Sequence, residues 1–219
     1  SVEAAIKEDD PHHASSRLLC LENTVGGKAI SLKKMQDVSE TARKNDLSIH
    51  LDGARFFNAV TALRCKPEEL ANCADSVSVC LSKGLGTPLG TVLVGSSKFI
   101  RKARRNRKIL GGSMRQVGIV AAAGHYALDN NVSRLVEDHN RAEFFANELR
   151  EMDIGHVDSG TNMVFFTPKD GQAENLRLHL EKYGVKIGDQ NPSIRMVIHR
   201  DISDEGLDKA IAGFKSFYQ

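Results

Sequence analysis

The sequence predicts an α/β protein in which a large domain with a mostly parallel sheet is followed by a small α+β domain. Short apolar, β-branched runs alternate with helical stretches through the first half of the chain, as in repeated β-α-β units. Polar residues follow these runs directly, at the strand ends where an open α/β sheet binds its ligands. Beyond Arg134 the runs become shorter and favour antiparallel pairing. We therefore expect one domain over residues 1–133 and a second over residues 134–219.

In the large domain, strand, helix and strand alternate through Asp52 to Lys83 and continue beyond it. The first long helix is expected because Leu32, Met35 and Val38 recur at helical spacing and share one face. The expected strands cover 17–21, 48–52, 77–81 and 91–96, and the expected helices 31–45, 99–107 and 117–128. Residues 1–7 read as the end of a helix, because their apolar residues have no N-cap before them.

The small domain is expected to contain longer helices and short strands in alternation. Its helices should cover 135–152, 173–183 and 203–217, and its strands 161–167 and 194–198. The pattern lacks the sustained run of parallel strands that marks the first half.

Composition and charge exclude several classes of partner. The 219 residues are 41% hydrophobic and 26% charged, and the formal net charge of +2 gives no preference for nucleic acid or membrane. The basic run Lys98–Lys108 reads as a solvated helix face, because it has almost no aromatic residues to stack on bases. No run approaches the roughly 18 apolar residues of a membrane helix. The cysteines and histidines lack metal-site spacing, so we expect reduced thiols, no metal and a cytoplasmic location.

Two strand ends carry the chemistry. The run Ser76–Gly86 ends in Ser82 and Lys83 and then turns on glycines, and Ser48–Val60 ends its strand at Asp52. A lysine amine partly removed from water is a nucleophile toward carbonyls, and a carboxylate can keep a pyridine nitrogen protonated. Pyridoxal phosphate requires this pair of groups.

Each residue also has a plainer interpretation. Lys83 could be a strand-end lysine whose methylene stem lies along apolar surface. Asp52 could cap a helix, with Arg55 as its surface partner.

Three segments together resemble the low-specificity L-threonine aldolases, pyridoxal-phosphate enzymes of fold type I. They are Asp52–Ala59 (Asp-Gly-Ala-Arg-Phe-Phe-Asn-Ala), Leu81–Gly90 (Leu-Ser-Lys-Gly-Leu-Gly-Thr-Pro-Leu-Gly) and Gly111–Gln116 (Gly-Gly-Ser-Met-Arg-Gln). The resemblance covers nearly the whole chain and implies an aspartate-aminotransferase-like fold with an incomplete large domain. Family members carry a long further segment before this point, which supplies the ring that stacks on the cofactor and the loop that cradles its phosphate. We therefore expect a fragment, either cleaved or part of a longer chain, and both options stay open: the N-terminal segment as a separate polypeptide partner or as part of the same chain.

The resemblance assigns the cofactor contacts. Lys83 would hold pyridoxal 5'-phosphate covalently, and Asp52 would pair with its pyridine nitrogen. Ser82 would donate a hydrogen bond to the phosphate, Arg115 would reach a neighbouring subunit's phosphate, and Arg55 would be a further contact.

The resemblance also assigns the substrate contacts. Arg195, which lies inside an apolar run and is expected to be buried, would grip the substrate carboxylate, with Arg55 as a second contact. His12, with His13 as the spare, would be the base that removes the β-hydroxyl proton.

The implied function is a carbon–carbon lyase that cleaves L-threonine or L-allo-threonine, as a β-hydroxy amino acid, to glycine and acetaldehyde. The implied assembly is a homotetramer, a dimer of dimers. Two alternatives stay open: another fold type I amino-acid lyase or transaminase, because these share the Asp–Lys–Arg set, and an inactive truncated chain that acts only in assembly.

Overall fold

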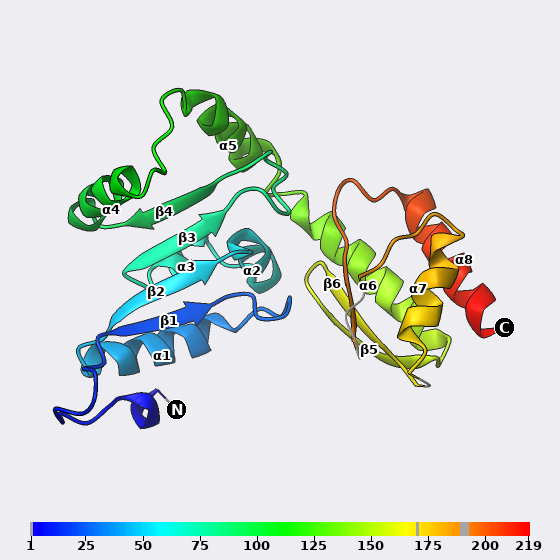
Figure 1. Ribbon diagram of the computed structural model, residues 1–219, viewed down its shortest axis with the longest axis horizontal. Helices are drawn as coiled ribbons and strands as arrows, with labels where there is room; N and C mark the ends of the chain where they lie inside the picture. Colours follow the sequence, from blue (N-terminus) through cyan, green and yellow to red (C-terminus); the bar gives the residue numbers. More distant parts are fainter. Residues whose placement is uncertain (1, 170, 189–192) are drawn as a thin grey trace. The chain divides into compact units, whose positions relative to one another are not determined.

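The computed structural model describes residues 2–169, 171–188 and 193–219, and the chain divides into two compact units (Figure 1). Unit 1 contains Ser1–Val25 and Ala29–Ser133, and unit 2 contains Gly26–Lys28 and Arg134–Gln219. Each unit has a sheet of its own.

Unit 1 is built on a four-stranded sheet in the order β1-β2-β3-β4 (Figure 1). The first three strands are parallel and the fourth is antiparallel to the third, so the mostly parallel sheet is confirmed. The strands are β1 (Leu18–Glu22), β2 (Ser48–Gly53), β3 (Ser76–Cys80) and β4 (Thr91–Gly95).

The helices of unit 1 connect these strands. Ser31 caps α1, since its hydroxyl accepts a hydrogen bond from the Lys34 N–H at 3.3 Å. Ala42 of this helix is buried against Ile49 of β2, which places α1 on one face of the sheet. The helices are α1 (Leu32–Lys44), α2 (Phe56–Leu63), α3 (Pro67–Ala71), α4 (Ser97–Ile109) and α5 (Gly118–Asn130).

Among its described residues, unit 2 has a three-stranded antiparallel sheet, in the order β5-β6-β7, and three helices. Its strands are β5 (Gly155–Gly160), β6 (Met163–Pro168) and β7 (Ile194–Val197), and its helices are α6 (Leu135–Glu151), α7 (Ala173–Glu181) and α8 (Asp204–Tyr218). The segment Gly26–Lys28 belongs to this unit: Lys28 pairs with Asp158 of β5 at 2.6 Å, and the Thr161 hydroxyl donates to the Gly27 carbonyl at 2.8 Å.

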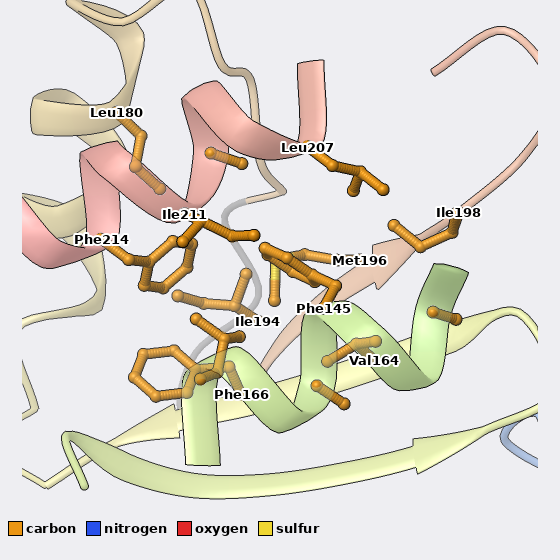
Figure 2. Packing of buried hydrophobic residues seen from close by; sticks show 14 of the residues in the cluster. Phe145, Val164, Phe166, Leu180, Ile194, Met196, Ile198, Leu207, Ile211 and Phe214 are labelled. Carbon is orange, nitrogen blue, oxygen red and sulfur yellow. The ribbon is translucent and has the colours of Figure 1, made fainter. Parts of the chain in front are cut away.

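Three phenylalanine rings form the centre of the unit 2 core (Figure 2). Phe214 of α8 packs edge-on against Phe145 of α6 and Phe166 of β6, with ring centroids 6.0 and 5.4 Å apart. All three side chains are at most 2% exposed. This core holds the helices on the sheet.

Two expectations about elements were wrong. The N-terminal residues form only a short 3-10 helix, η1 (Glu3–Ala5), none of whose own residues is buried, although the flanking Val2 and Ile6 pack partly buried against Ala42 and Ile49. The strand β5 (Gly155–Gly160) was missed, since its glycines and its charged residue mask the strand pattern. None of the described helices combines the length and the apolar character needed to cross a bilayer.

Candidate active site

Asp52 lies near the carboxyl end of β2, as expected. Its side chain is exposed, and Oδ1 accepts a hydrogen bond from the Ala54 N–H at 2.9 Å. This bond turns the chain out of the strand and toward α2, whose N-cap position is Arg55. Asp52 therefore shapes the turn before the helix while it presents its carboxylate to solvent.

Gly53 follows Asp52 because the backbone leaves no room for a side chain. A Cβ at this position would lie 2.7 Å from the Ser78 carbonyl oxygen and 2.9 Å from the Phe56 Cβ. The missing side chain lets α2 begin close against β3, so the Asp-Gly pair fixes the carboxylate at the strand end.

Lys83 lies three residues beyond β3, in a loop that hydrogen bonds hold in place. The Gly86 N–H donates to the Lys83 carbonyl at 2.8 Å, and the Leu81 N–H donates to the Gly90 carbonyl at 3.0 Å. The buried Asn131 side chain donates to the Leu85 carbonyl at 2.7 Å. These hydrogen bonds therefore fix the backbone of the loop that carries Lys83.

The Lys83 side chain itself is exposed, so the expected partial burial of its amine is wrong for this chain. The amine has no hydrogen-bond or ion-pair partner among the residues that the structure describes. The neighbouring Ser82 is also exposed, and its hydroxyl lies 3.6 Å from the Cys80 sulfur. Both side chains can therefore reach a ligand.

Polar residues of adjacent strands share one face of the sheet with Asp52. In the parallel register Asp52 aligns with Glu22 on one side and with Ser78 on the other, and aligned residues point to the same face. On the same face His50 lies 2.8 Å from Ser76, measured from Nδ1 to Oγ. His50, Ser76 and Ser78 were not among the predicted site residues, although the alternation of polar residues along β2 and β3 could have revealed them.

The other two predicted contacts of unit 1, Arg55 and Arg115, lie in separate segments of the chain. Arg55 is half-buried at the start of α2, directly after the turn that Asp52 forms. Arg115 is exposed in the connection between α4 and α5 and makes no ion pair with another described residue. Arg115 is thus free to bind an external anion.

The structure does not bring His12 to the carboxyl ends of the strands. The segment before β1 leaves the sheet at the amino end of that strand (Figure 1). There the His12 ring lies 2.8 Å from Asp10, and hydrogen bonds from the His12 backbone and ring hold the pKa of Asp10 below its usual value. Within one chain His12 and Asp52 are therefore not neighbours, and the catalytic role of His12 stays a prediction.

Arg195 belongs to unit 2 and is exposed, contrary to the expectation of burial. It alternates on β7 with the buried Ile194 and Met196, so its guanidinium faces outward. The side chain borders a cavity of about 430 Å³ that also contacts Lys186 and Lys209. Its role as the carboxylate contact also stays a prediction.

No group of three or more His, Cys, Asp or Glu side chains in the described part of the chain could hold a metal ion. The groups present at the strand ends are the amine of Lys83, the carboxylate of Asp52 and the hydroxyl of Ser82.

Comparisons with known proteins agree with the strand-end motifs. Residues 1–170 match the family model described as beta-eliminating lyase. Over 212 residues the chain is 44% identical to the low specificity L-threonine aldolase of Escherichia coli K12, covering 97% of this chain and 63% of that protein. It is 42% identical to low-specificity L-threonine aldolase 1 of Arabidopsis thaliana, again covering 63% of the relative.

Solved structures share the fold. A threonine aldolase from Leishmania major has a TM-score of 0.83 at 17% identity, covering all of this chain and 66% of that one. An N-acetylornithine aminotransferase from Stenotrophomonas maltophilia has a TM-score of 0.61 at 20% identity, covering 92% of this chain and 57% of that one. The fold is therefore that of fold type I pyridoxal-phosphate enzymes, as predicted. The family model matches residues 1–170, which are most of this chain, so the chain belongs to the beta-eliminating lyase family.

Proposed function

We propose that this chain carries the reactive amine of a carbon–carbon lyase that cleaves L-threonine and L-allo-threonine to glycine and acetaldehyde. The observation that carries the proposal is the position of Lys83, in a hydrogen-bonded loop that follows β3, while Asp52 lies on β2, the parallel neighbour of β3. The identity to proteins named low-specificity L-threonine aldolase supports this reaction, whereas the fold alone is compatible with several reactions.

The residues at these strand ends suit pyridoxal phosphate. Lys83 has an accessible amine that would hold the cofactor covalently, and Asp52 would keep a proton on the pyridine nitrogen. Ser82 would donate a hydrogen bond to the phosphate, and Arg115 would neutralise a phosphate charge from a neighbouring chain. When bound, the cofactor supplies an electron sink for the carbon that is losing a bond.

The chain's own groups would orient the substrate. Arg55 would pair with the substrate carboxylate, and Arg195 is proposed as a second carboxylate contact. In the reaction the Cα–Cβ bond breaks, a base removes the β-hydroxyl proton, and Cα takes up a proton, so no oxidant or reductant is needed. The base stays open, because the segment that contains His12 precedes β1 at the amino end of that strand, whereas Asp52 lies near the carboxyl end of the parallel strand β2.

The decisive experiment is a visible absorption spectrum of the purified chain after addition of pyridoxal phosphate. After unbound cofactor is removed, we expect a visible band that Lys83→Ala and Lys83→Arg both lack, because Lys83 is the amine proposed to bond the cofactor's aldehyde carbon. A band of equal strength in the wild-type chain and in both variants would contradict the proposal.

Activity is then measured after this chain is mixed with the part of the Escherichia coli relative that the match does not cover. Acetaldehyde release from L-threonine without an added keto acid supports the lyase, whereas keto-acid-dependent loss of the amino group indicates a transaminase.

The remaining features of the assembly are part of the same proposal. We place the enzyme in the cytoplasm, since the four cysteines are free thiols in the structure. We propose four copies, as the family resemblance implies; the exposed Arg115, which is suited to a neighbour's phosphate, supports more than one copy. Light scattering of the cofactor-loaded protein measures this copy number, and a single copy would contradict it.

A further inference from the structure

A cavity of about 430 Å³ lies in unit 2, among β7, the first half of α8 and the segment 183–188 that follows α7. This volume is in the range of pockets that bind small molecules, roughly 300–1,000 Å³. Part of the lining belongs to the core of unit 2, namely Phe145, Met196, Ile198 and Leu207 (Figure 2). A ligand in this cavity therefore meets a continuous apolar surface.

Hydrogen bonds hold the segment that forms one side of the cavity. The Val185 N–H donates to the Leu180 carbonyl at 3.1 Å, and the Tyr183 hydroxyl donates to the Ser216 hydroxyl of α8 at 2.7 Å. Val185 and Ile187 also pack against the core of unit 2. The cavity is therefore already formed, and a ligand that enters it has little chain to order.

Three basic side chains from three segments line the same cavity: Lys186, Arg195 of β7 and Lys209 of α8. None of these side chains makes a hydrogen bond or an ion pair with another residue that the structure describes. The described lining contains no Asp and no Glu. Three positive charges beside an apolar surface, without an acidic partner on the lining, attract an anion.

Glu205 lies one turn before Lys209 on α8, but it does not line the cavity. Hydrogen bonds from its own backbone N–H and from the Ser203 hydroxyl hold the pKa of the Glu205 carboxyl below its usual value, and the charge of Lys209 adds to this effect. Glu205 thus has hydrogen-bond donors of its own and makes no ion pair with Lys209. The Lys209 ammonium can therefore bind an external anion.

The lining as a whole decides what kind of ligand fits. A small hydrated anion would leave the apolar surface uncovered, and a neutral hydrocarbon would gain nothing from the three positive charges. A molecule with one carboxylate on a compact apolar body uses both parts of the lining.

We propose that this cavity binds apolar monocarboxylates. Lys186 and Lys209 hold the carboxylate, and the apolar body lies against Met196 and Leu207. Arg195 keeps its proposed role at the substrate carboxylate, so the site is assigned to the two lysines. Binding at this site does not depend on the proposed reaction.

The test is a titration of the isotope-labelled chain with hexanoate, followed by the NMR signals of the methyl groups. We expect saturable shifts at Ile187 and Met196 and none at Ile49, which lies in the core of unit 1. Butanoate should bind more weakly by about fourfold for each methylene that it lacks, because each methylene buries apolar surface. Absence of saturable shifts at Ile187 and Met196, or equal binding of the two acids, would overturn the proposal.

Other probes separate the carboxylate from the apolar body. Hexan-1-ol has a similar body without the charge, and acetate has the carboxylate without the body, so each should bind about tenfold or more weakly than hexanoate. An excess of L-threonine should leave hexanoate bound, because threonine offers almost no apolar body. Equal binding of hexan-1-ol or acetate would contradict the proposed pairing of charge and apolar surface. Displacement by L-threonine would place hexanoate in the proposed substrate site and contradict a site of its own.

Matched variants test the two lysines. Lys186→Gln with Lys209→Gln should weaken hexanoate binding by about tenfold or more, because the carboxylate loses both partners. Lys182→Gln with Lys215→Gln is the control: these lysines lie at the end of α7 and on α8, do not line the cavity, and should matter far less. All four side chains are exposed, so both pairs should fold, and circular dichroism checks this. Equal losses in the two pairs would assign the binding to general electrostatic attraction and overturn the proposal.

Discussion

At the scale of single residues, Gly53 shows how the backbone positions the candidate site. We expect Gly53→Ala to destabilise the chain by about 1–3 kcal/mol, because the added methyl meets the Ser78 carbonyl at 2.7 Å. Urea unfolding measures this change. Gly118→Ala is the matched control, since no atom lies within 4 Å of the added carbon and the helix favours alanine. Equal destabilisation of both variants would contradict the close-approach explanation.

The burial of His139 in α6 leads us to expect that the stability of the chain depends on pH. Burial lowers the pKa of this imidazole below its ordinary 6.5, against the opposing charge of Asp138. The unfolded chain therefore takes up a proton at a higher pH than the folded chain, so this contribution to stability is lost as the pH falls below about 6.5.

Unfolding in urea between about pH 7.5 and 5.5 measures this effect, above the range where carboxylates titrate. His139→Gln should reduce the slope of stability against pH. His125→Gln, at an exposed position of α5, should keep the wild-type slope. An unchanged slope in His139→Gln would assign the pH dependence to other groups.

The residues at the strand ends were predictable, but their exposure was not. Asp52 and Lys83 follow apolar runs, and that pattern is local in sequence. The exposure of Lys83 depends on what packs over the loop, and the exposure of Arg195 depends on strand alternation between Ile194 and Met196. The separation of His12 from Asp52 follows from the direction of β1, and direction is a property of the folded sheet.

At the scale of elements, long periodic stretches were predicted well and irregular ones were not. Helix α1 matches its expected range closely, because its apolar spacing and its Ser31 cap agree. Strand β5 has no such signal, since it gains its stability by pairing with β6 along its whole length. Pairing between distant segments is the information that local patterns lack.

Helix α6 contains an ion pair that we expect to be important for unit 2. Asp138 is fully buried and lies 2.9 Å from Arg134, whose side chain is 20% exposed, at the first turn of the helix. Asp138→Ala should destabilise the chain by about 2–3 kcal/mol, because it leaves a partly buried guanidinium without this partner. Thermal unfolding measures the loss.

A surface pair provides the control for Asp138. Lys33 and Asp37 of α1 lie 2.6 Å apart, but their side chains are 80% and 53% exposed. Asp37→Ala should therefore cost no more than about 0.5 kcal/mol. If both substitutions destabilise the chain to the same small extent, burial of Asp138 has no energetic role.

At the scale of the whole molecule, the two units have separate cores. The core of unit 2 is centred on Phe214, and the sheet of unit 1 packs Ile49 against α1. Calorimetry should therefore show two unfolding transitions. Phe214→Ala, which removes a fully buried ring at a cost of about 3–5 kcal/mol, should lower only the transition of unit 2. Gly53→Ala should lower only the other transition, because the clash lies within unit 1. A single transition that both substitutions shift would mean that the separate cores unfold as one cooperative structure.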